Sequence, residues 1–226
     1  MPQTYGADVP QCPRCRKATT GGGNIHSTLT LPIDSTPASE DLCRSFMDFM
    51  REAQLQIVKK RKGQSLRPFM GGALIVTVKA PVGPAQTLRY VGASGEHVPT
   101  RRWTLSGVRM VTRTAWVDTA ADPPLIAGWN YARNAGGGIP ALRDGAPYTL
   151  TTTTFGNCAA PKMLRAFYED MRQNHGKPDH NAHWGVQELQ MTEMWWHPEE
   201  TAGRYEVIPS CAGCRQLLPQ MLCMRP

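Results

Sequence analysis

The sequence predicts an α/β protein, with helices and strands mixed along one chain of 226 residues. Apolar residues recur at helical spacing in two widely separated segments, and short strand-like runs are bounded by Gly and Pro. The predicted elements follow in the order helix, hairpin, strand, helix, two strands, helix. The length fits one large domain, or one domain with an N-terminal extension, better than two full domains.

Residues 1–38 are rich in Gly, Pro, Ser and Thr, so we expect a loosely structured extension before a domain of residues 39–226. The first helix is expected to begin at Ser39, because this serine cap is followed by two acidic residues. The helix ends in a basic run at residues 59–62, which suits the negative end of the helix dipole. Its apolar positions are Leu42, Phe46, Phe49, Met50, Ala53 and Ile57.

Three strands are expected next. Residues 72–79 and 86–92 have strand character, and the Pro-Val-Gly-Pro sequence at 81–84 predicts a hairpin turn between them. Residues 107–117 are the third predicted strand. The stretch 120–145 is rich in Pro, Gly and Ala and is expected to be a long loop, a kind of segment that is often functional in a compact domain.

A second helix is expected to open at Pro161 and Lys162, because proline is well tolerated in the first turn of a helix. Two further strands, at residues 184–196 and 204–208, and a final helix at 211–222 complete the prediction. The inner face of the second helix is predicted to consist of Met163, Leu164, Phe167 and Met171.

Composition narrows the classes of function. The formal net charge of +7 favours a polyanionic partner, although a solvated basic surface without a partner is the plain alternative. No apolar run approaches the roughly 18 residues of a membrane span, and residues 1–6 lack the features of a signal peptide. We therefore expect a cytosolic site of action and no membrane contact. The seven cysteines include two C-x-x-C pairs, which suit metal binding in a reducing compartment.

Three cysteines in the last third of the chain predict a metal site. Cys158 directly precedes the second helix, and Cys211 and Cys214 lie on one face of the first turn of the final helix. Helix N-termini lower thiol pKa values and favour thiolates. Three protein ligands leave one coordination position of zinc open for water, which is typical of catalytic rather than structural sites.

Two other cysteine arrangements remain open. Cys12 and Cys15 could join Cys211 and Cys214 in a closed four-cysteine structural zinc site. A separate second zinc site could comprise Cys12, Cys15, His26 and Cys43, although Cys43 and Cys223 are most simply buried thiols of the core.

Residues 158–162, Cys-Ala-Ala-Pro-Lys, resemble the C-A-E-P-K motif of bacterial polymorphic-toxin members of the cytidine deaminase-like superfamily. Residues 209–214 resemble the P-C-x-x-C motif of that superfamily, with Ser210 inserted after the proline. The resemblance covers about residues 40–222 in element order. It implies a three-layer α/β/α fold with a mixed central sheet flanked by helices. It also implies Zn²⁺ bound by Cys158, Cys211 and Cys214, and hydrolytic deamination of cytosine.

The chain departs from this pattern at Ala160, which stands where the family has its catalytic Glu. Alanine cannot relay protons, so the chain is either an inactivated variant or a natural pseudoenzyme. A single replacement in an otherwise intact motif favours deliberate inactivation. The terminal strands that many relatives carry are also missing, and the predicted strand at 107–117 could take their place.

Several residues are candidates for substrate contact. Aromatic rings can stack on unpaired bases and arginines can meet phosphates, although aromatic residues more often belong to a core. Phe155 and Asn157 should line the pocket if the zinc site exists. His183 and His197 are weaker candidates, because isolated histidines are usually surface residues. The other candidates are Trp103, Trp129, Tyr131, Trp195, Trp196, Arg101, Arg102 and Arg133.

The sequence thus favours a zinc-dependent cytosine deaminase acting on nucleic acid, most simply on single-stranded DNA. If it is a toxin domain, an immunity protein is a further expected partner. One alternative is a non-catalytic, zinc-stabilised nucleic-acid-binding module in which Ala160 is native. A deaminase of free nucleosides or nucleotides is another, disfavoured by the basic charge.

Overall fold

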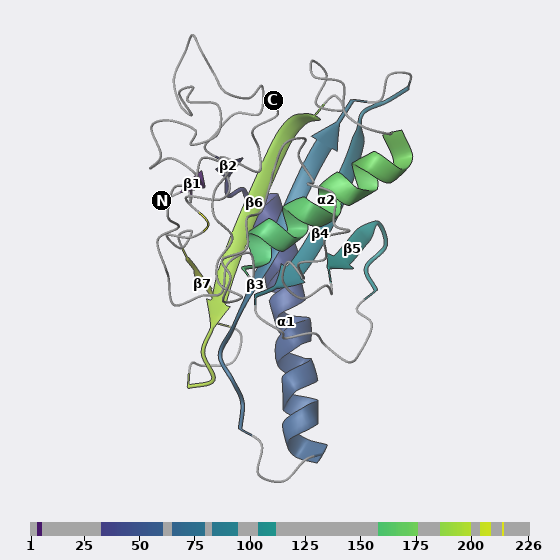
Figure 1. Ribbon diagram of the computed structural model, residues 1–226. Coiled ribbons are helices and arrows are strands. Elements are labelled where there is room, and N and C mark those ends of the chain that lie inside the picture. The colour runs from purple at the N-terminus through teal and green to yellow at the C-terminus, as the bar shows by residue number, and fades with distance from the viewer. Residues whose placement is uncertain are drawn as a thin grey trace, which may run out of the picture.

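The computed structural model shows an open, mixed β-sheet with one helix packed on each face (Figure 1). The residues that it describes are 4–5, 33–60, 65–79, 83–94, 104–111, 158–175, 186–199, 204–208 and 214. In chain order the elements are β1 (Thr4–Tyr5), β2 (Ile33–Asp34), α1 (Pro37–Lys60), β3 (Phe69–Val78), β4 (Gln86–Ala93), β5 (Val108–Val111), α2 (Ala159–His175), β6 (Val186–Trp196) and β7 (Glu206–Val207).

The sheet has the strand order β1-β2-β6-β3-β4-β5, and β7 pairs with β6 outside this path. The central strand β3 is antiparallel to both neighbours, β4 and β6. Strand β2 runs parallel to β6, and β5 runs parallel to β4. The predicted α/β class is confirmed, and a sheet with a helix on each face is compatible with a three-layer α/β/α fold.

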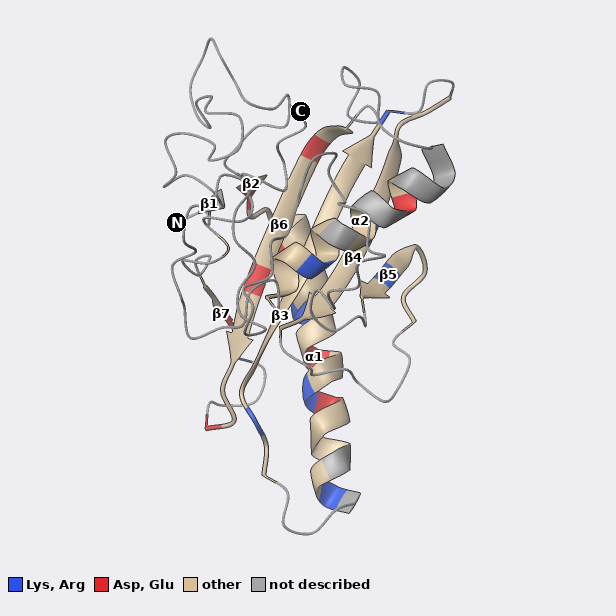
Figure 2. Cartoon of the chain, in the orientation of Figure 1, with Lys and Arg blue, Asp and Glu red and all other residues tan. Residues whose placement is uncertain are grey.

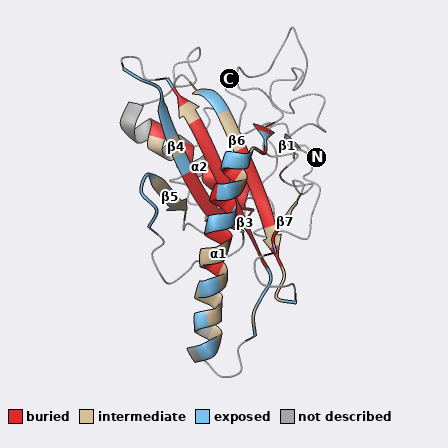
Figure 3. Ribbon diagram, turned by 180° about the vertical axis from the view of Figure 1, so that it is seen from behind, coloured by how far each residue is buried: buried red, intermediate tan, exposed pale blue. Residues whose placement is uncertain are grey.

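Helix α1 covers the rear face of the sheet in the view of Figure 1 and is in front in Figure 3. Its first half is buried against the sheet, whereas its second half extends past the sheet and is more exposed (Figure 3). The predicted start and cap at Ser39 were wrong by a few residues: α1 begins at Pro37, and Thr36 caps it, because the Thr36 hydroxyl accepts the N–H of Ser39 at 3.3 Å. Thr192 of β6 fixes this end through hydrogen bonds of 2.7 Å with the hydroxyls of Ser35 and Ser39.

Strand alternation divides the core into two layers. Along β3, Leu74 and Val76 belong to the layer beneath α2, whereas Ala73 and Ile75 belong to the layer beneath α1. A strand that alternates its side chains between two faces can be apolar throughout only when both faces are covered, as here. The same alternation on β6 separates Met191, on the α2 side, from Met194, on the α1 side.

Helix α2 confirms the predicted inner face. Its four predicted inward positions are all buried, and they pack on β3 and β4. The helix begins at Ala159, two residues before the predicted Pro161. The buried face comprises Met163, Leu164, Phe167 and Met171.

The remaining predictions have mixed outcomes. The hairpin of β3 and β4 is confirmed, with the described part of its turn containing Gly83 at a positive φ of 111°. Strand β5 confirms the start of the predicted third strand, and Val111 is the last residue described there. Two short strands, β1 and β2, lie in the segment predicted as a loose extension, and Ile33 is part of the core.

The predicted loop at 120–145 lies outside the described residues. None of the described helices is long and apolar enough to cross a membrane.

Candidate functional site

The start of helix α2 lies directly over strands β3 and β6. Gly72 of β3 makes this close approach possible. A Cβ at Gly72 would lie 2.8 Å from Met163 Cε and 3.1 Å from the Cβ of Ala159. It would also lie 3.3 Å from Cγ of Glu193, which is paired with Gly72 across the sheet. A side chain at 72 would therefore require the Met163 methyl group to move and the contacts with Ala159 and Glu193 to give way by a few tenths of an ångström.

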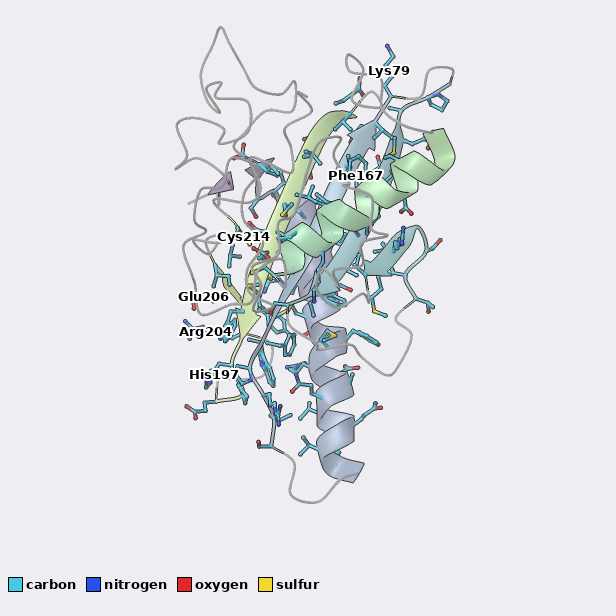
Figure 4. The ribbon with its side chains drawn as sticks, viewed as in Figure 1. Lys79, Phe167, His197, Arg204, Glu206 and Cys214 are labelled. Atoms are coloured by element: carbon cyan, nitrogen blue, oxygen red, sulfur yellow. The ribbon has the colours of Figure 1, made fainter. Side chains whose placement is uncertain are left out.

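Two of the three predicted metal ligands lie in one buried cluster at this place. Cys158 immediately precedes α2 and is 4% exposed, and Cys214 is helical and 2% exposed. Both belong to the core layer beneath α2. Figure 4 shows Cys214 beside the first turn of α2. Neither cysteine forms a disulfide with another described cysteine. The third predicted ligand, Cys211, lies outside the described residues.

Strand β7 explains how distant parts of the chain meet at this cluster. It pairs with the end of β6, where Val207 is opposite Met194. The next residue, Ile208, donates its N–H to the backbone oxygen of Glu193 at 3.2 Å and packs against the α2-side core. Ile208, the last described residue before the second cysteine motif, therefore lies beside Glu193.

Residue 160 lies in the same buried layer as the two thiols. Ala160 is fully buried, and its N–H donates to Oε1 of Glu193 at 3.0 Å. Lys162, in the same turn, is also buried, and its Nζ donates to the backbone oxygen of Ala93 at 3.1 Å. Ala160 is thus hydrogen-bonded to β6, and Lys162 is hydrogen-bonded to β4.

Glu193 is a candidate site residue that the sequence reasoning missed. It is 1% exposed, and it lies on the face of β6 that also carries Leu189, Met191 and Trp195. Figure 2 shows that β6 carries acidic positions in an otherwise uncharged strand. An acidic residue at a core position of a predicted strand was the available signal, because a buried charge requires partners.

The two adjacent tryptophans lie on opposite faces of the sheet. Trp196 is 3% exposed on the α1 side, where its ring centroid is 5.2 Å from that of Phe69. Its Nε1 has no hydrogen-bond partner among the described residues. Trp195 is only partly buried, and it packs against the α2-side layer that contains Cys158. This geometry favours Trp195 over Trp196 as a base-stacking ring.

Cys43 confirms its prediction as a core thiol. It is fully buried on the sheet-facing side of α1, and its Sγ donates to the backbone oxygen of Gly71 in β3 at 3.6 Å. Burial raises the pKa of the Cys43 thiol, and the charge of Glu193 raises it further. A thiol that remains protonated is a poor metal ligand, which disfavours Cys43 as a member of a second zinc site.

His197 follows β6 and is partly buried, and its Nδ1 accepts the N–H of Glu199 at 3.4 Å. The other predicted contact and ligand residues lie outside the described ranges. These are Cys12, Cys15, His26, Arg101, Arg102, Trp103, Trp129, Tyr131, Arg133, Phe155, Asn157, His183 and Cys223.

The described part of the chain contains no group of three His, Cys, Asp or Glu side chains that could hold a metal ion. It does place two soft sulfur donors in one buried cluster, one at the start of a helix, and this donor type suits zinc. A third thiol from Cys211 would complete the predicted set. The two described donors are therefore compatible with a zinc site, and the third predicted ligand lies outside the described residues.

No protein-family model, curated protein or solved structure matches this chain.

Proposed function

We propose that this chain is a zinc-dependent deaminase domain of the cytidine deaminase-like type, acting on cytosine in single-stranded DNA and inactivated at Ala160. One observation carries the proposal. Cys158 and Cys214, from two separate motifs, are both buried in the core layer beneath α2, and Cys158 directly precedes that helix. The sheet with a helix on each face also supports the proposed three-layer fold.

In this proposal Cys158, Cys211 and Cys214 hold the metal. Zinc with three protein ligands supplies a nucleophile near neutral pH by acidifying water. The chain's own task is to bind the cytosine, exclude bulk water and move protons. The buried surroundings of Cys158 and Ala160 support water exclusion, because both side chains are almost fully covered by the core.

Proton transfer is the function that this chain lacks. Residue 160 is the second residue of α2 and lies two positions after Cys158. A Glu there would carry protons to the base and to the departing amine, as the motif resemblance implies. Ala160 has no titratable group, so the domain as given should bind its substrate without converting it.

Substrate contacts are proposed at the same end of the sheet. Trp195 lies on the α2 face of β6 and is partly exposed, so it is the proposed stacking ring. Strand β4 ends at Ala93, whose backbone oxygen holds Lys162 of α2. Arg101 and Arg102 follow this end closely in sequence and are proposed phosphate contacts. Trp129, Phe155 and Asn157 complete the proposed substrate residues.

The second candidate is a non-catalytic, zinc-stabilised nucleic-acid-binding module. It is favoured by the presence of Ala160 itself, because a native alanine needs no explanation in a protein that catalyses nothing. This module could hold zinc in a closed site with Cys12, Cys15, Cys211 and Cys214. If the proposed deaminase domain belongs to a toxin, it acts in the cytosol and an immunity protein is its expected partner.

Metal analysis of cysteine variants distinguishes the two sites. We expect one zinc per chain, with Cys158→Ser and Cys211→Ser each reducing zinc binding strongly and Cys12→Ser leaving it unchanged. Cys43→Ser is the matched control for loss of a buried thiol, because Cys43 lies in the other core layer. Equal zinc loss in Cys12→Ser and Cys211→Ser, with full retention in Cys158→Ser, would support the closed site and contradict the proposal.

A further inference from the structure

The net positive charge of this chain is concentrated in one segment. Residues 53–95 contain seven Lys or Arg residues and no Asp or Glu. Because the formal net charge of the whole chain is +7, basic and acidic residues are equal in number outside this segment. The segment comprises the second half of α1, the connection to β3 and the β3–β4 hairpin. Charge separated in this way creates a positive potential over one part of a surface.

The second half of α1 carries part of this charge past the sheet (Figure 2). Lys59 is exposed in the last turn of the helix. Arg67 is exposed in the connection to β3, and its N–H donates to Oε1 of Gln54 at 3.1 Å. Gln54 precedes Lys59 by about one and a half helical turns, so this bond holds the returning chain beside the end of the helix. Lys59 and Arg67 together are the basic end of α1.

Neither cation of the basic end has a carboxylate partner among the described residues. A lysine in a helix is neutralised most readily by an acidic residue three or four positions before it. A glutamine and a leucine occupy those positions before Lys59. By contrast, Arg51 in the preceding part of α1 forms an ion pair with Asp48 at 3.5 Å. The positive charge of the basic end is therefore not neutralised by the described residues around it.

The helix dipole explains only part of this arrangement. A cation in the last turn interacts favourably with the partial negative charge at the C-terminus of a helix, which accounts for Lys59. Arg67 lies outside the helix, and placing like charges near one another is unfavourable. Cations without acidic neighbours gain affinity for a polyanion, because each phosphate contact releases counterions.

We propose that the basic end of α1 binds the phosphate backbone of single-stranded nucleic acid. Charge complementarity identifies this ligand, and phosphate contacts bind without reading the base sequence. Helix α1 packs on the face of the sheet opposite α2 (Figure 3), so this surface is distinct from the cluster at Cys158. The inference rests on the proposed function only for its nucleic-acid ligand, and it requires neither a metal ion nor catalysis.

The salt dependence of DNA binding by the parent chain tests this surface. Lys59→Gln/Arg67→Gln removes two phosphate contacts, and each contact with a single strand contributes about 0.7 to the slope of log Kd against log salt. The slope should therefore fall by about 1.4 in the double variant. Its loss of affinity relative to the parent should then be about sevenfold greater at 50 mM than at 200 mM salt. Oligonucleotides of different base composition should show the same change.

Arg44→Gln/Arg204→Gln is the matched control. It removes the same charge from two exposed arginines that have acidic residues close in sequence. Asp41 is three residues before Arg44 in α1, and Glu206 is two residues after Arg204. The control should change the slope by less than half as much as Lys59→Gln/Arg67→Gln. Equal changes in the two double variants would overturn the proposal, because net charge rather than its position would then determine binding.

Two further outcomes would assign these cations to another role and overturn the proposal. If Lys59 and Arg67 only stabilise the end of α1, Lys59→Gln/Arg67→Gln should lower the urea midpoint of unfolding and keep the parent's salt slope. If they contact a membrane surface, the same variant should lose binding to vesicles that contain anionic phospholipid while its DNA binding is unchanged.

Activity in the Ala160→Glu background separates this inference from the proposed function. There Lys59→Gln/Arg67→Gln should raise the KM for an oligonucleotide at low salt and leave kcat unchanged. If Ala160→Glu is inactive but the parent and the double variant bind DNA with the expected slopes, the deaminase proposal fails and the phosphate-binding surface stands. If Ala160→Glu is active and the double variant binds DNA as the parent does, only this surface is overturned. Absence of DNA binding by the parent chain at 50 mM salt would overturn both.

Discussion

Hydrogen bonds to β4 and β6 hold residue 160 and its neighbour Lys162 in place. The side chain at 160 is a methyl group, yet its N–H is held by Glu193 and the Nζ of Lys162, in the same turn, by Ala93. The backbone frame of the motif is therefore complete in the absence of a proton-transferring group. Neither hydrogen bond uses the side chain at 160, so a substitution there leaves both donors and acceptors in place.

The two tryptophans at the end of β6 give a prediction at the same scale. Trp195→Ala should weaken binding of single-stranded DNA by about 1–3 kcal/mol, because the partly exposed ring is the one available to stack on a base. Trp195→Ala should lower the free energy of unfolding less than Trp196→Ala does. Fluorescence anisotropy with a labelled oligonucleotide measures the change in the free energy of DNA binding.

Trp196→Ala should instead lower the free energy of unfolding by about 3–5 kcal/mol, since it removes a buried ring that packs on Phe69. Urea denaturation of both variants measures their free energies of unfolding and shows which tryptophan contributes more to stability. Equal losses of DNA affinity in two folded variants would contradict the assignment of the rings to opposite faces.

At the scale of elements, a polar cluster joins α2 to the edge of the sheet. Asp170 of α2 accepts a hydrogen bond from the hydroxyl of Tyr90 in β4, with an O–O distance of 3.0 Å. The same carboxylate forms an ion pair with Arg109 of β5. The ring of Tyr90 also contacts Phe167 edge-on, with centroids 6.2 Å apart. These contacts hold the short strand β5 and the middle of α2 against β4.

Tyr90 makes the stability of this cluster dependent on pH. Burial raises the pKa of Tyr90 from 10 to about 12, and Arg109 opposes part of the rise. A raised pKa in the folded state means that this contribution is complete below pH 10 and is lost as the pH rises towards about 12. The free energy of unfolding should therefore fall across this interval.

Tyr90→Phe should reduce that alkaline loss, because phenylalanine has no proton to release. At neutral pH the variant should be less stable by about 1.5 kcal/mol, the usual cost of a hydrogen bond to a charged group. Some alkaline loss should persist, because burial and Asp48 also raise the pKa of Tyr205. Identical pH profiles of unfolding for parent and variant would refute the assignment to Tyr90.

At the scale of the whole molecule, the helices and strands with a clear sequence pattern could be predicted. The first helix and the inner face of α2 follow from helical periodicity, and the β3–β4 hairpin follows from two strand-like runs on either side of a Pro-Gly turn. Strands β1, β2 and β7 have two residues each, which is too short for any period to appear. Their pairing depends on tertiary contacts, such as those of Thr192 with the start of α1.

The candidate site was predictable in part. Spacing and resemblance identified Cys158 and Cys214, and the structure places both in one buried cluster. Glu193 was missed because its partner is a backbone N–H from an element distant in sequence, and no motif encodes such a pair. The opposite faces of Trp195 and Trp196 follow from strand alternation, because the predicted strand at 184–196 contains both residues.

The net charge of +7 gives a prediction for the domain as a whole. Binding of single-stranded DNA to the chain as given should weaken at least about tenfold between 50 and 200 mM salt, because phosphate contacts release counterions. Titrations with an oligonucleotide of fixed length measure this slope. An affinity that is unchanged over this range would remove the support for a nucleic-acid substrate.

The central claim is that only a proton-transferring group is missing from a deaminase site. A positioned general acid or base contributes about 10²- to 10⁴-fold in rate, and here one carboxylate would serve several transfers. The most direct measurement is conversion of cytosine to uracil in a single-stranded oligonucleotide by zinc-loaded Ala160→Glu. We expect conversion by this variant and none by the parent chain or by Ala160→Gln. If Ala160→Glu keeps its zinc and its fold but leaves DNA, RNA and free cytidine unchanged, the claim is contradicted and the binding module becomes the better account.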